Sequence, residues 1–163
     1  MAARSCEIAE AARVALVAAW PNTDSPIPTF IVDDDWDVDT VDDLNEIEGR
    51  WVIVSDENYG QIAQATRCED EEEYVIAVAF IERYTGALDS KGRVPKAWKE
   101  ERKALLQNNI FRVLNNHRGT PIIDEVSVET CDVTIVMDRD FMRKNKVFCG
   151  VVEVAYRELR EVT

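Results

Sequence analysis

Acidic side chains crowd residues 30–49, FIVDDDWDVDTVDDLNEIEG, which hold seven aspartates and two glutamates. Carboxylates so spaced can bind Ca²⁺, as in a helix–loop–helix calcium loop with oxygen ligands at positions 1, 3, 5 and 12 and Gly at position 6. A calcium loop that starts at Asp35 would take four ligands: Asp35, Asp37, Asp39 and Glu46. The match is partial, because position 6 is Thr40 and position 8, which should be apolar, is Asp42. A calcium-binding module is therefore one hypothesis.

The same stretch could imitate a polyanion. Residues 33–73 hold sixteen acidic and two basic side chains, whereas residues 91–118 hold eight basic and two acidic ones. A DNA-mimic inhibitor would spread its carboxylates over one convex face at the spacing of duplex phosphates, but here they fall in two runs that a basic helix interrupts. We rank the mimic below a third interpretation, a solvated, partly anchored arm in which Trp36 plugs into the body or contacts a partner.

No residue pattern indicates catalysis or a cofactor. His117 is the single histidine and lies at a predicted helix end, where its charge would complement the helix dipole. Neither a G-x-S-x-G elbow, nor G-x-G-x-x-G, nor a Walker loop occurs. The four cysteines form no C-x-x-C pair, so we expect no zinc site, and buried free thiols at Cys131 and Cys149. We expect a protein that is not an enzyme and uses no cofactor.

The composition predicts one folded domain over residues 1–163, with an acidic loop or arm at about 21–49. The hydrophobic fraction of 46% is that of a globular chain, and 163 residues can bury a core. The net charge of −13 argues against specific nucleic-acid binding through phosphates and against an anionic membrane surface. The start MAARSCEIAE does not have the pattern of a signal peptide, so we expect synthesis in a reducing cytoplasm.

Hydrophobic periodicity and turn residues predict the elements of the N-terminal half. Ser5 is expected to cap a helix that runs to Trp20 and ends at Pro21. Thr40 is expected to cap a brief helical turn in the acidic arm. Extended segments are predicted at residues 29–32, 50–55, 60–68 and 73–84. The last of these is apolar on both alternating faces, which predicts a central strand covered on both sides.

The strongest helix begins at Pro95 and ends at Gly119 and Pro121. Its apolar side is predicted to consist of Trp98, Leu105, Leu106, Ile110, Val113 and Leu114. Four charged side chains are predicted to lie away from that side: Lys99, Glu100, Arg102 and Lys103.

Two long strands are predicted to close the chain. In the first, within DEVSVETCDVTIVMD, the apolar residues change parity, which predicts a bulge near Glu129 and Thr130. The basic segment RDFMRKNK turns the chain, and residues 147–159 return. The predicted fold class is α+β: a mixed, mainly antiparallel β-sheet packed by an N-terminal helix and one long amphipathic helix, with a C-terminal β-hairpin.

This order of elements resembles a known family. The segments that carry the resemblance are DLNEIEGRWVIV, ATRCEDEEEYVIAVAFIERY and LLQNNIFRVLNNHRG, followed by the closing hairpin. From about residue 43 to 159 the chain resembles the tail terminator, or tail-completion, proteins of long-tailed bacteriophages. The head-closure (stopper) proteins of the neck, whose plan is more barrel-like, are the alternative within the same class.

The resemblance implies a structural virion protein of the tail or neck, made in the host cytoplasm. Six protomers would form a ring that caps the tail tube and joins it to the head-side stopper or connector. Its implied partners are further copies, the tail tube protein, that head-side protein and, in a contractile tail, the sheath protein. DNA would pass through the ring, and an acidic lumen would let it slide without binding.

Ring subunits need complementary patches that meet head to tail. The acidic candidates for such an interface are Asp33, Asp34 and Asp35, together with Trp36. The basic candidates are Arg139, Arg143, Lys144 and Lys146. We predict that the acidic and basic groups face each other across a subunit boundary.

Overall fold

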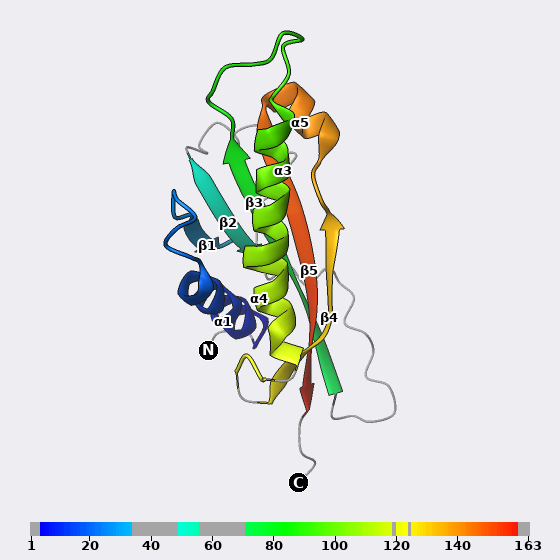
Figure 1. The fold of residues 1–163 in the computed structure, drawn as a ribbon. Coiled ribbons are helices and arrows are strands. Elements are labelled where there is room, and N and C mark those ends of the chain that lie inside the picture. The colour runs from blue at the N-terminus through cyan, green and yellow to red at the C-terminus, as the bar shows by residue number, and fades with distance from the viewer. Residues whose placement is uncertain (1–3, 34–48, 56–70, 119, 124, 160–163) are drawn as a thin grey trace.

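A five-stranded sheet forms the centre of the fold in the computed structural model, which describes residues 4–33, 49–55, 71–118, 120–123 and 125–159 (Figure 1). The strands are β1 (Thr29–Val32), β2 (Arg50–Ser55), β3 (Glu71–Arg83), β4 (Val126–Ile135) and β5 (Val147–Leu159). Their order across the sheet is β1-β2-β3-β5-β4. β1 and β2 are parallel and all other neighbours are antiparallel. Together with the helices, this sheet confirms the predicted α+β class.

Two helices pack on one face of this sheet (Figure 1). The first is α1 (Arg4–Ala19). The second is continuous over residues 96–118 and consists of α3 (Lys96–Leu105), the π-helical segment η1 (Leu106–Phe111), α4 (Arg112–Asn115) and the 3-10 turn η2 (Asn116–Arg118). A short helix, α5 (Arg139–Asn145), stands between β4 and β5 at the end of the sheet where α3 begins (Figure 1).

The main core lies between the helices and the sheet. β5 contributes four fully buried side chains to this core: Phe148, Val152, Val154 and Tyr156. Gly150 belongs to the same face, and a Cβ at this position would lie 2.6 Å from Cδ2 of Leu106. The absence of a side chain therefore lets the long helix approach β5 closely.

The opposite face of the sheet carries a second apolar cluster. Its buried members are Ile53, Ala79, Ile81, Val147 and Cys149, and Phe141 of α5 packs against them. β3 is the middle strand and has buried residues on both faces, as the apolar run in the sequence predicted. Cys131 and Cys149 are buried free thiols, which is also confirmed.

A buried ion cluster connects α3 to the sheet, and it corrects one prediction. Arg102 was predicted to lie away from the apolar side of its helix, but it is only 8% exposed. Its Nε donates to Oε2 of Glu82 at 2.6 Å, while Nε of Arg50 donates to the other oxygen of the same carboxylate. The Arg102 guanidinium also lies 4.4 Å from the ring centroid of Trp98. A helical pattern treats arginine as polar, whereas a buried carboxylate and an aromatic face can hold it inside.

Other local predictions have mixed outcomes. The bulge near Glu129 is confirmed by a register shift between Val128 and Thr130, and a second, unpredicted shift follows in β4. The predicted turn RDFMRKNK contains the helix α5. The prediction that Ser5 caps the first helix is wrong, because α1 already includes Arg4, which pairs with Glu7 and Glu158. The predicted Thr40 turn and the strand at 60–68 lie outside the described residues.

Candidate functional site

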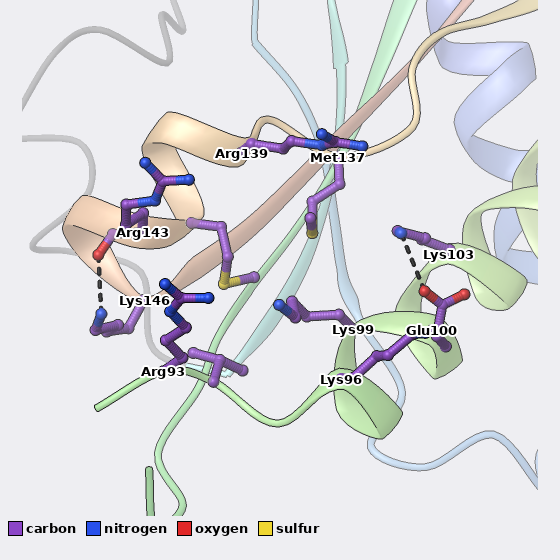
Figure 2. Close-up of a pocket in the computed structure, with 11 residues that line it drawn as sticks. Arg93, Lys96, Lys99, Glu100, Lys103, Met137, Arg139, Arg143 and Lys146 are labelled. Atoms are coloured by element: carbon purple, nitrogen blue, oxygen red, sulfur yellow. Dashed lines mark hydrogen bonds and ion pairs between the residues drawn. The ribbon is translucent and has the colours of Figure 1, made fainter. Parts of the chain in front are cut away.

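A pocket of about 280 Å³ lies between the N-terminal half of α3 and α5 (Figure 2). Seven basic side chains line what we call the α3–α5 pocket: Arg93, Lys96, Lys99, Lys103, Arg139, Arg143 and Lys146. They come from the loop before α3, from α3 itself, and from α5 with the residues that flank it. Figure 2 shows the α3 residues on one side of the pocket and the α5 residues on the other, with the amino group of Lys146 donating to the backbone oxygen of Arg143 at 2.9 Å.

Helix geometry explains the α3 side. Pro95 precedes the first turn with φ −57°, which is compatible with helix initiation and needs no N–H donor at that point. Lys96, Lys99 and Lys103 are spaced three and four residues apart, so they share one face of α3. This face is separate from the one that buries Arg102 and Leu105 against the sheet.

The α5 side depends on a capped helix. The Asp138 side chain accepts a hydrogen bond from the backbone N–H of Phe141 at 3.0 Å, which satisfies one of the free donors of the first turn. Lys146 ends the helix in the left-handed region, with φ 58°. Arg139 and Arg143 are four residues apart and therefore project from the same side of α5.

Apolar side chains form the base of the pocket. Val94 and Met142 are each 4% exposed and belong to the main core, and Met137 packs against it. Methionine side chains are flexible and polarizable and can adapt to a partner of irregular shape. The pocket therefore combines a basic rim with an adaptable apolar floor.

The rim carries charge that the described part of the chain does not neutralise. Among the described lining residues, Glu100 is the one acidic side chain, and it is paired with Lys103 at 3.1 Å. Within the same part of the chain, Lys96, Lys99, Arg139 and Arg143 have no carboxylate within ion-pair distance. Like charges gathered in one pocket attract an anionic partner, and guanidinium groups suit carboxylates and phosphates.

The predicted interface residues have different outcomes. Arg139, Arg143 and Lys146 come together in the pocket, while Lys144 lies on α5 and does not line it. Asp33 follows β1 and donates its backbone N–H to Val54 O at 3.0 Å. The remaining acidic-stretch candidates, for the interface and for calcium, lie outside the described residues: Asp34, Asp35, Trp36, Asp37, Asp39 and Glu46.

The α3 half of the site was not predicted from the sequence. Lys99 and Lys103 were assigned only to a polar helix face, and Arg93 and Lys96 were not singled out. A stripe of lysines three and four residues apart, directly after a basic loop, was the available signal.

Two cysteines lie buried outside the pocket. Burial raises the pKa of the Cys131 thiol to about 11 and that of Cys149 to about 12, so both stay protonated and unreactive near neutral pH. The part of the chain that the structure describes contains no group of three or more His, Cys, Asp or Glu side chains arranged to hold a metal ion. Its helices are also too short or too polar to cross a membrane.

Comparison with known proteins leaves the family open. No protein-family model matches the chain, and a search of curated proteins found no detectably similar sequence. The α3–α5 pocket and the fold are thus the observations from which a function can be argued.

Proposed function

We propose that this protein is a ring-forming structural subunit of the neck of a long-tailed bacteriophage, a tail terminator that caps the tail tube and joins it to the head-side connector. The observation that carries the proposal is the α3–α5 pocket. A chain of net charge −13 gathers seven basic side chains in one place and concentrates its acidic residues elsewhere. Such a molecule has two complementary patches, and patches of this kind allow head-to-tail contacts that close into a ring.

The fold supports a terminator over a stopper. Its sheet is open, with β1 and β4 at the two edges and both long helices on one face. This plan agrees with the protomer that the resemblance implies, a β-sheet packed by helices. The stopper proteins are expected to be more barrel-like, and in the described strands β1 and β4 do not pair.

Native mass and negative-stain imaging of the purified chain test the proposal. We expect closed rings, or a monomer that forms rings on isolated tail tubes, at about 50 mM salt, and weaker assembly at about 500 mM because salt screens exposed charges. Reversal of Arg143 and Lys144 to Glu should weaken assembly further.

A matched control is the reversal of Arg112, an exposed arginine of α4 outside the pocket. A chain that stays monomeric at every concentration and ignores tail tubes would contradict the proposal. If the same chain gained thermal stability from Ca²⁺, reversibly with a chelator, the calcium module would replace it. Capture of a host DNA-binding protein by a dimer would favour the DNA mimic.

A further inference from the structure

The chemistry of the α3–α5 pocket specifies what it binds. We propose that it receives an acidic peptide segment from a second copy of the chain, namely the aspartate-rich stretch that begins at Asp33. This inference rests on the proposed function, because each subunit of a head-to-tail ring needs two complementary surfaces. One surface binds the neighbour on one side, and the other is bound by the neighbour on the opposite side.

The pocket favours a ligand with carboxylates and at least one apolar side chain. Its rim supplies guanidinium groups from Arg93, Arg139 and Arg143, which can bind carboxylates through two parallel hydrogen bonds. Its floor consists of Val94, Met137 and Met142. Inorganic phosphate would leave this floor uncovered, whereas residues 33–43, DDDWDVDTVDD, combine aspartates with tryptophan and valine.

Charge outside the pocket disfavours nucleic acid as the occupant. The whole chain has a net charge of −13, so the surface beyond the seven rim cations is more acidic still. A duplex is extended, would cross that surface and would be repelled there. A short acidic segment contacts only the pocket and its rim.

Strand register places the start of the stretch far from the pocket of its own copy. Val32, the last residue of β1, is in register with Val152 of β5 through β2 and β3. α5 ends shortly before Val147, five residues away along β5. Five residues are about 17 Å along a strand and three strand spacings are about 14 Å across the sheet, which gives a separation of roughly 22 Å. Asp33 itself therefore lies away from the pocket of its own copy, and we assign the segment to a neighbouring copy because a closed head-to-tail ring requires a contact between copies.

Two complementary variants test the proposal by mixing. The pocket variant carries Lys99→Glu and Arg143→Glu, and the segment variant carries Asp33→Lys, Asp34→Lys and Asp35→Lys. Each alone should lose about tenfold or more in self-association constant at low salt, the scale of close interfacial charge pairs. Mixed in equal amounts, they should assemble with each other, because the intact segment of one variant meets the intact pocket of the other and the reversed segment meets the reversed pocket. Both sets of changes in one chain should restore self-association.

Controls separate the possible failures. Arg112→Glu, outside the pocket, should assemble as the wild type does, and unchanged thermal midpoints should show that every variant folds. Assembly of the pocket variant equal to that of Arg112→Glu would overturn the inference and leave the ring intact. Failure of the two variants to assemble with each other would overturn it in favour of binding within one copy, and a short DNA duplex bound through Lys99 and Arg143 would also overturn it. Assembly of the mixture, with a wild type that never closes rings on tail tubes, would uphold the pocket and refute the terminator.

Discussion

Glu82 lies between two arginines in the interior, so we expect the packing of α3 against the sheet to depend on its charge. Its carboxylate accepts from Nε of Arg50 and Nε of Arg102, and the Glu82 side chain is 7% exposed. Glu82→Gln keeps the shape but removes the carboxylate that both guanidinium groups share, and it leaves Arg102 with only the exposed Glu101 as a countercharge. We expect a loss of about 3–5 kcal/mol in the free energy of unfolding, measured by urea denaturation.

The same arginine offers the control for this prediction. Glu101 also pairs with Arg102, at 3.2 Å, but its side chain is 67% exposed. Glu101→Gln should therefore cost less than about 1 kcal/mol. Equal losses in the two variants would show that the buried position of Glu82 adds nothing.

The buried thiols give the protein a pH dependence at the alkaline end. Burial, with a smaller contribution from the charge of Asp138, raises the pKa of Cys149 from its ordinary value of 9.0 to about 12. Above about pH 9 the unfolded chain releases a proton that the folded chain retains. The free energy of unfolding should therefore fall as the pH rises from about 9 towards 12.

Cys149→Ala isolates this contribution. We expect the loss of stability between about pH 8 and pH 10 to be smaller in the variant by about 1 kcal/mol, measured by urea denaturation at both values. Part of the slope should remain, because burial also raises the pKa of Cys131 and of Tyr156. Identical slopes in wild type and variant would exclude the Cys149 thiol as the source.

At the scale of the elements, the alternation of apolar and polar residues predicted the strands well. Helical periodicity was a weaker guide to the internal structure of the long helix over residues 96–118. β2 and β5 have the predicted bounds, because their turn residues and period-two patterns coincide. The segment η1 was not predictable, because a π-turn inserts a residue and shifts the phase of the helix. Asn109 lies on the buried face, four residues after Leu105, where its Nδ2 donates to Oδ2 of Asp24 at 2.9 Å. A pattern of apolar residues alone does not predict that a polar asparagine is buried.

The N-cap of α5 is the element on which the basic pocket depends most directly. Asp138→Ala removes the side-chain acceptor for the Phe141 N–H and should destabilise this seven-residue helix by about 1 kcal/mol. Amide hydrogen exchange should become faster in α5, and self-association should weaken as Arg139 and Arg143 lose their fixed positions.

Asp140→Ala is the matched control for the cap. Asp140 also lies in the first turn and favours the helix dipole, but it does not accept the capping bond. Asp140→Ala should change the free energy of opening of α5, measured by amide hydrogen exchange, by a few tenths of a kcal/mol at most. Unchanged exchange in Asp138→Ala would mean that packing of Phe141 and Met142 alone holds α5 in place.

At the scale of the whole molecule, the charges of the candidate site were visible in the sequence but their meeting was not. Residues 91–118 and the RDFMRKNK segment are each basic, and both were noted as such. They come together because the β4–β5 hairpin places α5 at the end of the sheet where α3 starts, as Figure 1 shows. That arrangement depends on strand lengths and on the β4 register shifts, and only one of these shifts left a signal in the sequence.

The overall charge leads to a prediction about DNA. If the protein forms a ring through which DNA passes, the ring should not retain it. In a gel-shift measurement at about 150 mM salt, we expect neither the wild type nor the Lys99→Glu/Arg143→Glu variant to retard a short DNA duplex. Phosphate binding needs clustered cations on an otherwise neutral or basic surface. The net charge of −13 opposes this, and neighbouring copies that fill the pocket would remove its cations from contact with DNA. Retardation that weakens steeply with salt in the wild type and is absent in the variant would show instead that the pocket binds phosphates, and it would place basic side chains in the lumen.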